Sequence, residues 1–521
     1  MRHISLSETF DYTPRAVALG VFDGLHIGHR AVISAVCGVR HAAATAPFLT
    51  SCVFSLTDVP KAHARLTTEN EIDDVCETLG ADEWLAVPFA DVCSLSPEQF
   101  VTDVLHHRLH AKVVCCGENY RFGKNGAGDA ATLVELCRPL DITVRVIPSV
   151  NVDGEAVSTT RILEALSGGD IPTVRRLSGR PYRIVQTVSH GNHIGRTWGF
   201  PTINQTLPDT ALPRLGVYAS MVVIDGVCHR AVTNVGIHPT VGGAPKPLAE
   251  TWIDGFDGDV YGDTLAVELV RFLRDEQRFD TREQLQAQID ADRAAALAFL
   301  DGGDNRRAVL FDFDDTLQDR RAAFYAAAYE LLARYMPYAD EATLSERARI
   351  MLDENNGGYV NYPVYFETMF ARWEWQGVDS PEALHREYMH CFPSHTTLFA
   401  DATDTLRALR ARGYLTGVIT NGSRLMQNRK LDISGLRPLL DVTVVSGDEG
   451  VQKPDPELFR RTAMRLGLAP QHCVYVGDHP VNDMQGAREA GMRTVFLNAG
   501  NFPPPDGVAV ADTPTDVLST I

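Results

Sequence analysis

The segment GVFDGLHIGH, residues 20–29, begins inside an apolar run, AVALGVF, that predicts a buried strand. A glycine-rich turn then leads into a helical stretch, HRAVISAVCGV, and we expect the helix to start near His26. The first turn of a helix presents unpaired amide groups, which bind phosphate oxygens. His26 and His29 are three residues apart, so both can face the same phosphate. The segment therefore predicts a site for the phosphates of a nucleotide.

Three successive patterns divide the rest of the chain. Alternating strand-like and helical segments over residues 1–180 predict an α/β domain with a parallel sheet. Short strand-like runs between Gly, Asn, Asp and Pro residues over 181–303 predict a small antiparallel β-barrel, closed by a helix near 281–300. From 304 to 521 the alternation returns, with a helical insert at about 321–395. We therefore expect a multidomain α/β chain whose last domain has a Rossmann-like core and a helical cap.

Composition excludes several classes of partner. The 521 residues carry a formal net charge of −19, which repels nucleic-acid polymers and anionic membranes. No apolar run is long enough to span a bilayer, and the ten cysteines include no C-x-x-C pair. We expect a soluble, cytoplasmic protein without a membrane or nucleic-acid partner. A homo-oligomer is compatible with the sequence.

Three further motifs follow the first segment along the chain. They are GENYRFGKNGAGD at 117–129, VSTTRI at 157–162 and GFPTIN at 199–204. In this order they resemble the bifunctional riboflavin kinase/FAD synthetase family of bacteria. The resemblance implies a Rossmann-like nucleotidyltransferase domain that adenylylates FMN, with His26 and His29 in catalysis. It implies nucleotide or phosphate binding by Gly20, Phe22, Asp23, Gly24, Asn119, Ser158, Thr159, Thr160 and Arg161.

One position departs from the pattern of this family. VSTTRI matches the S-S-T-x-x-R phosphate-binding motif, but the arginine of that motif falls on Leu163. Arg161, two residues earlier, is the nearest cation, although neighbouring positions at a helix start point in different directions. If Leu163 vacates a phosphate contact, the loss of one charge-assisted hydrogen bond costs about 2 kcal/mol. Because the rest of the site is intact, we expect a working adenylyltransferase.

The segment HGNHIGRTWGFPTIN, residues 190–204, matches the riboflavin kinases of the same family. Pro201 fixes the turn that presents Thr202, and the resemblance implies that Thr202 and Asn204 hold Mg²⁺ and the ATP phosphates. Glu250 is the implied base that takes the proton of the ribityl hydroxyl, and Arg274 is expected near the flavin. The other implied ATP-binding residues are Gly191, Gly195 and Arg196.

A different chemistry is predicted near the start of the third domain. FDFDDTL, residues 311–317, places Asp312 and Asp314 two residues apart at a strand end, so both carboxylates face the same side. This arrangement, with Thr420, Asn421, Lys453, Asp478 and Asp483 following in order, resembles a haloacid dehalogenase superfamily phosphatase. The resemblance implies Asp312 as nucleophile, Asp314 as acid/base and Lys453 as the neutralising cation. The implied Mg²⁺ ligands are Asp312, Asp314, Asp478 and Asp483.

Together these resemblances imply three reactions, with ATP as substrate and FMN and FAD as products. The chain would phosphorylate riboflavin, adenylylate FMN, and hydrolyse a small phosphomonoester with Mg²⁺. FMN and the phosphorylated ribityl-aminouracil precursor of riboflavin are candidate substrates of the hydrolase. A kinase and phosphatase with an inactive adenylyltransferase domain, or a non-catalytic flavin-binding regulator, are alternatives. The aromatic residues of the insert, Tyr359, Tyr362, Phe366, Trp373 and Trp375, are expected mostly to form the core of the cap.

Overall fold

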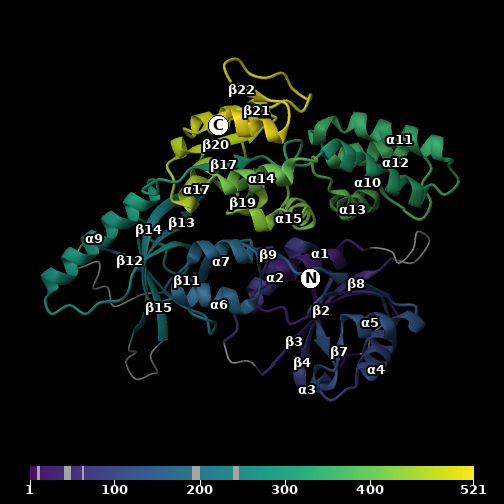
Figure 1. Cartoon of the computed structure of the whole chain (residues 1–521), viewed down its shortest axis with the longest axis horizontal. Helices are drawn as coiled ribbons and strands as arrows, with labels where there is room; N and C mark the ends of the chain where they lie inside the picture. The colour runs from purple at the N-terminus through teal and green to yellow at the C-terminus, as the bar shows by residue number, and fades with distance from the viewer. Residues whose placement is uncertain (9–11, 40–47, 61–63, 190–199, 239–245) are drawn as a thin grey trace.

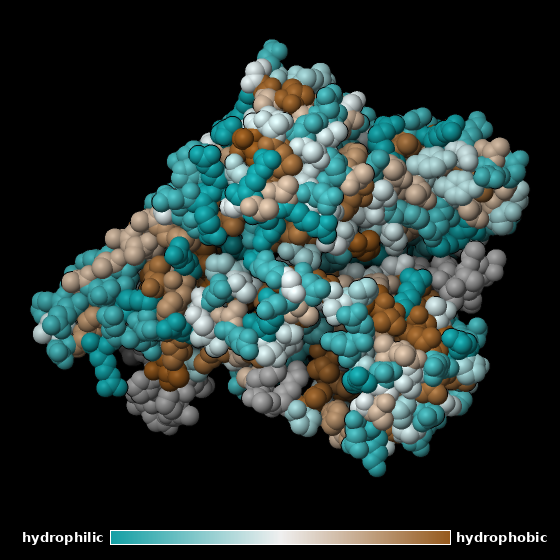
Figure 2. All heavy atoms as spheres, in the orientation of Figure 1, coloured by the Kyte–Doolittle hydropathy of each residue, from teal (hydrophilic) through white to brown (hydrophobic). Residues whose placement is uncertain are grey.

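Three sheets follow one another along the chain, as the computed structural model shows (Figure 1). It describes residues 1–8, 12–39, 48–60, 64–189, 200–238 and 246–521. In the view of Figure 1 the first sheet lies at the lower right, the second at the left and the third at the top. No helix in these ranges is long and apolar enough to cross a membrane. On the face drawn in Figure 2 the hydrophobic residues form small, separate groups among hydrophilic ones.

The first sheet is parallel, with six strands in the order β1-β4-β3-β2-β5-β8. Its central strands are buried on both faces, as expected where helices cover a parallel sheet. The predicted α/β fold is confirmed. The strand order reverses between β2 and β5, and ligands bind at such switch points beyond the carboxyl ends of the strands. The elements are β1 (Arg2–Ser5), β2 (Arg15–Gly20), α1 (Ile27–Cys37), β3 (Thr50–Thr57), α2 (Glu69–Leu79), β4 (Glu83–Pro88), α3 (Phe89–Val92), α4 (Pro97–Gln99), η1 (Phe100–Arg108), β5 (Ala111–Gly117), β6 (Arg121–Phe122), η2 (Lys124–Gly126), β7 (Gly128–Asp129), α5 (Ala130–Cys137), η3 (Arg138–Leu140), β8 (Thr143–Ile147), β9 (Asn151–Val152), β10 (Glu155–Ala156), α6 (Thr159–Gly168) and α7 (Ile171–Ser178).

The second sheet is antiparallel, in the order β11-β16-β13-β14-β15-β12. The sheet curls so that its edge strands, β11 and β12, approach each other. Where they meet, the backbone N–H of Ser189, which follows β11, donates to the carbonyl of Asn204 in β12 at 2.8 Å. The predicted antiparallel barrel is confirmed. The elements are β11 (Tyr182–Thr187), β12 (Thr202–Thr206), β13 (Gly216–Ile224), β14 (Val227–His238), β15 (Lys246–Ile253), β16 (Thr264–Arg274) and α9 (Arg282–Leu300).

Helices α6 and α7 precede the barrel in sequence but share its hydrophobic core. Ile162 and Leu166 of α6 and Leu177 of α7 belong to one buried cluster with Tyr218 and Leu269 of the barrel strands. The first two parts of the chain are therefore joined by a continuous apolar contact and not by a bare linker.

The third sheet is parallel, in the order β19-β18-β17-β20-β21-β22. Between β17 and β18, helices α10 to α13 form the cap at the upper right of Figure 1, and α14 then packs on the core sheet. The predicted Rossmann-like core with a helical cap is confirmed. The elements are β17 (Ala308–Phe311), α10 (Arg320–Tyr335), α11 (Glu341–Glu354), η4 (Asn356–Gly358), α12 (Tyr362–Arg372), α13 (Pro381–Cys391), η5 (Phe392–His395), α14 (Ala402–Ala411), β18 (Leu415–Thr420), α15 (Arg424–Ile433), η6 (Arg437–Leu439), β19 (Val442–Val445), α16 (Ser446–Glu449), α17 (Pro456–Leu466), η7 (Pro470–His472), β20 (Cys473–Gly477), η8 (Pro480–Gln485), α18 (Gly486–Glu489), β21 (Arg493–Leu497), β22 (Ala509–Ala511), η9 (Pro514–Asp516) and α19 (Val517–Thr520).

Buried ion pairs join the third part to the other two. The Asp432 carboxylate of α15 accepts from Arg30 of α1 at 2.9 Å and from Arg437 at 2.5 Å, and all three side chains are buried. Figure 1 shows α15 directly beside α1 and α2 at this junction. On the barrel side, Arg465 of α17 donates to the buried Glu268 of β16 at 2.8 Å. Because a buried charge without a partner is costly, these pairs fix how the parts dock.

Replacing Asp432 tests this docking. Asp432→Asn removes the charge between two buried guanidinium groups, so we expect the free energy of unfolding to fall by about 3–5 kcal/mol in urea denaturation. The control is Asp404→Asn, which removes an exposed pair with Arg407 and is expected to cost less than about 1 kcal/mol. An equal decrease in the free energy of unfolding in the two variants would show that the ion pairs of Asp432 do not stabilise the contact between the first and third parts of the chain.

Candidate functional sites

The turn after β2 is held by hydrogen bonds to the segment that directly precedes α2. Asp23 Oδ1 accepts from the N–H of Leu66 at 2.8 Å, and the hydroxyl of Thr67 accepts from the N–H of Gly24 at 3.2 Å. Gly20 is required here because a Cβ would come within 2.7 Å of the Phe22 ring. Asp23 therefore organises the turn, which the sequence predicts to hold phosphate.

The two histidines stack at the start of α1. Their ring centroids lie 3.6 Å apart, and His26 Nδ1 accepts from the N–H of His29 at 3.2 Å. Burial, reinforced by the Arg180 cation, lowers the pKa of His26 to about 4. His26 is therefore neutral near pH 7, and with Nδ1 accepting, its proton is on Nε2. This N–H can donate to a phosphate oxygen without the cost of burying a cation.

Other predicted nucleotide-binding residues meet at the same edge of the sheet. The Thr159 hydroxyl at the start of α6 donates to the carbonyl of Asp23 at 3.2 Å, so two helix N-termini approach this turn. Asn119 follows β5, the neighbour of β2, and is exposed. Ser158 caps α6, and Thr160 lies exposed in its first turn. A cavity of about 290 Å³ opens beside this edge, lined by residues that include Phe22, Asp23, Thr57, Arg65 and Trp84.

The cations near this turn are not arranged as the sequence suggests. Arg161 donates to the carbonyls of Glu155 and Ala156 at 2.7 and 3.0 Å, so its guanidinium is held at the β9–β10 hairpin. Its phosphate-binding role stays a prediction. Arg180, which the sequence analysis did not select, donates to the carbonyls of Gly24 and Leu25 at 3.3 and 3.2 Å. Its position, as the last residue of the predicted first domain, carries no signal of a site.

In the barrel, strand register brings the predicted kinase residues into one row. Glu250 of β15 is paired with Asn204 of β12 on one side and with Asn234 of β14 on the other. Directly opposite residues of antiparallel strands share a face, and Thr202, two residues from Asn204, lies on that face as well. A carboxylate is thus flanked by two amides, next to a hydroxyl that could hold a metal.

The remaining predicted kinase residues are less informative. Gly191, Gly195 and Arg196 lie outside the described residues. Arg274 forms a bidentate ion pair with Asp292 of α9, at 2.7 and 2.6 Å. This pair ties α9 to the barrel, and a role of Arg274 toward flavin stays a prediction.

In the third part, one lysine joins two of the four predicted aspartates. Lys453 Nζ donates to Asp312 Oδ1 at 2.6 Å and to Asp483 Oδ1 at 2.7 Å, and its side chain is buried. Burial alone would lower the pKa of Lys453, but the two carboxylates raise it above its usual value. Lys453 is therefore a permanent cation that offsets the repulsion between these aspartates.

Asp478 is the carboxylate that lacks a partner. Within the described part of the chain it has neither a hydrogen bond nor an ion pair, although it is buried and its oxygens lie within 4.8 Å of those of Asp312 and Asp483. Burial, together with Asp312 and Asp483, raises the pKa of Asp478 to about 9. Three buried carboxylates with one unpaired member fit a hard divalent cation such as Mg²⁺. When bound, the cation would supply positive charge for phosphoryl oxygens.

Asp314 points to a different partner. Both of its oxygens accept from Lys430 Nζ, at 2.5 and 2.6 Å, and Oδ2 accepts from Gln427 at 2.8 Å. Burial alone would raise the pKa of Asp314, but Lys430 and Arg320 outweigh it and lower the pKa. The carboxylate of Asp314 is not in the group that could hold a metal, so its predicted ligand role stays untested.

Gln427 and Lys430 were not identified from the sequence. Their spacing on α15 places both on one helix face, but nothing local indicates that this face meets Asp314. The predicted Thr420 and Asn421 lie beside them. The Thr420 hydroxyl accepts from Gln427 at 3.0 Å, and the Asn421 amide exchanges two hydrogen bonds of 2.9 Å with the backbone of Lys453. The site is therefore one connected network.

Family comparisons agree with this three-part organisation. The model for FAD synthetase matches residues 10–161, the model for riboflavin kinase matches 178–300, and the model for haloacid dehalogenase-like hydrolase matches 309–497. The bifunctional riboflavin kinase/FMN adenylyltransferase of Pseudomonas fluorescens is 34% identical over 288 residues. That match covers 91% of the relative and 54% of this chain.

The chain belongs to the bifunctional riboflavin kinase/FMN adenylyltransferase family. The relative from Escherichia coli K12 is 31% identical, with 92% of it and 54% of this chain covered. A crystal structure named as a macrolide-efflux protein of Streptococcus pneumoniae is similar with a TM-score of 0.50 and 27% identity, covering 57% of this chain and 99% of that one. The chain is thus an enzyme of this family that carries an additional haloacid dehalogenase-like hydrolase domain.

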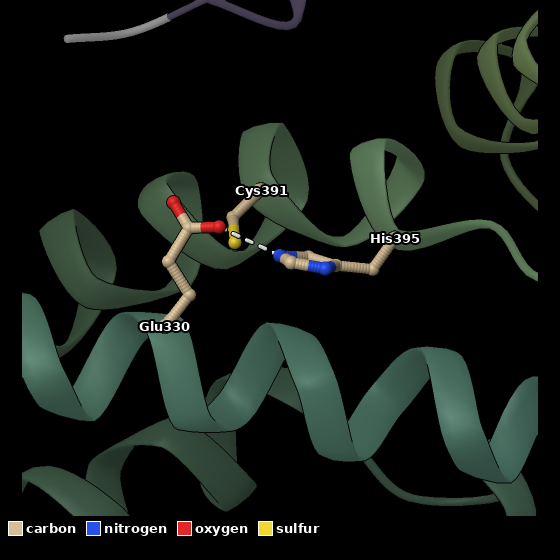
Figure 3. A group of neighbouring side chains, drawn as sticks. All are labelled: Glu330, Cys391 and His395. Carbon is tan, nitrogen blue, oxygen red and sulfur yellow. Dashed lines mark hydrogen bonds and ion pairs between the residues drawn. The ribbon is translucent and has the colours of Figure 1, made fainter.

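A second group of metal-ligating side chains lies in the cap of the hydrolase domain (Figure 3). Glu330 of α10 and His395 of η5 are joined by a hydrogen bond of 2.6 Å, and Cys391 lies beside them. Burial raises the pKa of the Cys391 thiol, which favours the protonated form that does not bind metal. We interpret this group as a structural contact that joins α10, the first helix of the cap, to η5 at its end.

Stabilisation of the hydrolase domain by Mg²⁺ should depend on pH. The pKa of Asp478 is about 4 in the unfolded chain and about 9 in the folded protein. The folded state therefore binds the proton more tightly, and the free energy of unfolding of the metal-free protein falls as pH rises from about 4 to about 9. Mg²⁺ binds the ionised form, so we expect it to raise the unfolding temperature by several degrees at about pH 8.5 and by much less at about pH 6.

Differential scanning fluorimetry with and without Mg²⁺ measures this difference. Asp478→Asn should remove the Mg²⁺ effect and reduce the pH dependence to the part that comes from Asp312, whose pKa burial raises to about 7. A Mg²⁺ shift that is equal at the two pH values, or that survives in Asp478→Asn, would contradict the assignment of the cluster.

Proposed function

We propose that one chain catalyses three reactions: phosphorylation of riboflavin by ATP, adenylylation of FMN to FAD, and Mg²⁺-dependent hydrolysis of a small phosphomonoester. The proposed domains are 1–180, 181–303 and 304–521, with the cap at about 321–395. Membership of the family and the order of the motifs along the chain support the two transferase activities. The observation that carries the hydrolase proposal is the Asp312–Lys453–Asp483 network beside the unpaired Asp478.

For adenylyl transfer, the protein supplies position and hydrogen bonds. Neutral His26 and the amides at the start of α1 can donate to the α-phosphate as charge develops on it, and Arg180 holds the carbonyls of the preceding turn. This arrangement supports in-line displacement without a covalent intermediate.

The inactive adenylyltransferase remains the second candidate, because Leu163 stands where the family motif has arginine and Arg161 is bound to the hairpin. Leu163→Arg discriminates the two. If the native site works, we expect the rate of FAD formation from FMN and ATP in Leu163→Arg to differ from that of the wild type by less than about threefold. One charge-assisted hydrogen bond to the phosphates would change this rate by more. A rise of tens-fold would show that the native domain is an inactive relic.

For riboflavin phosphorylation, Glu250 is the proposed general base. Its position between Asn204 and Asn234 places a proton acceptor beside the residues proposed to hold Mg²⁺ and ATP. Proton removal from the ribityl hydroxyl during attack on the γ-phosphate is the step that requires it.

Glu250→Gln tests this role by keeping the size of the side chain and removing its basicity. We expect FMN formation from riboflavin to fall by about 10²–10⁴-fold. FAD formation from supplied FMN should be unchanged in the same variant, because that reaction uses the first domain. Chromatographic separation of riboflavin, FMN and FAD measures both. Retained kinase activity, or an equal loss of both activities, would contradict the proposal.

For phosphomonoester hydrolysis, Asp312 is the proposed nucleophile, held at the end of β17 with its N–H bonded to Val476. Lys453 keeps one of its oxygens fixed, and the other can attack phosphorus. Lys430 holds Asp314 as a carboxylate, so the proton for the leaving oxygen would come from Lys430 and pass through Asp314, which leaves Lys430 neutral. Burial lowers the pKa of Lys430, which makes this release easier. In the second step Asp314 would take a proton from the water that attacks the phosphoryl group on Asp312 and return it to Lys430. FMN and the phosphorylated precursor of riboflavin are the candidate substrates.

A further inference from the structure

Three aromatic rings from separate segments meet beside the carboxylates of the hydrolase domain. Tyr359 follows η4 in the cap, His479 directly follows Asp478, and Phe502 lies in the loop after β21. The His479 ring lies 5.3 Å from Tyr359 and 4.5 Å from Phe502, and Tyr359 lies 6.1 Å from Phe502. Tyr359 is 56% exposed.

Tyr359 differs in this respect from the other aromatic residues of the cap. Phe366 is buried, while Tyr362, Trp373 and Trp375 pack against the core of the cap, as the sequence predicts for most of them. Tyr359 instead contacts rings of the Rossmann-like core across the boundary between cap and core. An exposed aromatic ring that is oriented by two others needs an explanation other than core packing.

The rings lie close to the reacting groups. The backbone N–H of His479 donates to Asp483 Oδ2 at 3.0 Å, and His479 directly follows Asp478. Since the Tyr359 ring lies 5.3 Å from the His479 ring, the ring cluster borders the group of Asp312, Asp478 and Asp483. A molecule that contacts this ring cluster would therefore have another part of itself near Asp312.

Hydrogen bonds fix the His479 ring and hold the loop that carries Phe502. His479 Nδ1 accepts from the N–H groups of Val481 and Asn482 at 3.1 and 3.0 Å, which fixes the imidazole. Asn501, next to Phe502, donates to Asp315 at 3.1 Å.

The segment that carries Tyr359 rests on Arg320. The guanidinium of Arg320 donates to Asn355 at 2.7 Å. A Cβ at Gly358, which has a φ of 90°, would come within 2.6 Å of the same guanidinium. The cluster is thus preorganised before a ligand arrives, which reduces the entropy lost on binding.

We propose that Tyr359, His479 and Phe502 form a subsite for a planar heteroaromatic ring on the leaving group of the phosphomonoester. Aromatic side chains stack on conjugated rings, whereas a sugar or polyol phosphate offers no such face. A flavin ring and a pyrimidine ring share this chemistry. The inference rests on the proposed phosphatase function and narrows its substrate class.

The test compares phosphomonoesters with and without a ring, in the full-length chain with Mg²⁺ and without ATP. FMN carries a tricyclic ring, uridine 5′-monophosphate carries a pyrimidine, and ribitol 5-phosphate has the chain of FMN without a ring. We expect kcat/KM to be at least about tenfold higher for one or both ring-bearing substrates than for ribitol 5-phosphate. A preference for FMN alone would show that the subsite binds a flavin ring. A preference for uridine 5′-monophosphate alone would show that it binds a single pyrimidine ring.

Variants of Tyr359 separate stacking from simple contact between cap and core. Tyr359→Ala should lower kcat/KM about tenfold for the ring-bearing substrate, mainly through KM, and leave ribitol 5-phosphate within about twofold. Tyr359→Phe should retain the preference. Tyr338→Ala, at another exposed tyrosine of the cap, is the matched control and should change neither.

The outcomes distinguish the subsite from the activity on which it depends. Equal kcat/KM for all three substrates, or an equal loss for all of them in Tyr359→Ala, would overturn the subsite and leave the phosphatase proposal intact. If none is hydrolysed faster than by an Asp312→Asn blank, both are overturned.

Discussion

The shared ion pairs of Asp432 with Arg30 and Arg437 hold α15, the helix that carries Asp432, at the junction between the first and third parts of the chain. One face of this helix docks on the adenylyltransferase domain through buried charges. Another face carries Lys430, which pairs with Asp314 at the phosphatase site. Met426, on the same helix, belongs to the hydrophobic core of the cap. A single ten-residue helix, α15, therefore contacts the neighbouring domain, the reacting carboxylates and the cap.

Charge balance explains why the hydrolase site needs two lysines. Four aspartates lie at the carboxyl edge of one parallel sheet, where desolvation would drive them to take up protons. Lys453 pairs with Asp312 and Asp483, and Lys430 pairs with Asp314 and lowers its pKa. Burial and the neighbouring carboxylates still raise the pKa of Asp312 to about 7 and that of Asp478 to about 9. The remaining deficit of positive charge is where a divalent cation fits. The same logic appears at His26, which avoids a buried charge by staying neutral.

Local patterns predicted the fold well, since the strand-turn-helix at residues 15–37 and the Asp312–Asp314 strand end depend on neighbours in sequence. Asn204 and Glu250 were predictable from the order of the family motifs, but their pairing with each other and with Asn234 depends on strand register and was not. Long-range contacts escaped prediction. Lys430 reaches Asp314 across 116 positions and Arg180 reaches Gly24 across 156, and no spacing rule connects such pairs.

The central claim is that a chain of the flavin-synthesising family also hydrolyses a phosphomonoester that carries an aromatic ring. The most direct measurement is a chromatographic time course of riboflavin, FMN, FAD and inorganic phosphate with ATP and Mg²⁺, in the wild type and in Asp312→Asn. We expect both proteins to form FMN and FAD. When FMN or a pyrimidine nucleotide is then added in excess, we expect only the wild type to release inorganic phosphate. Identical phosphate release by the two proteins would show that the third domain does not hydrolyse these phosphomonoesters.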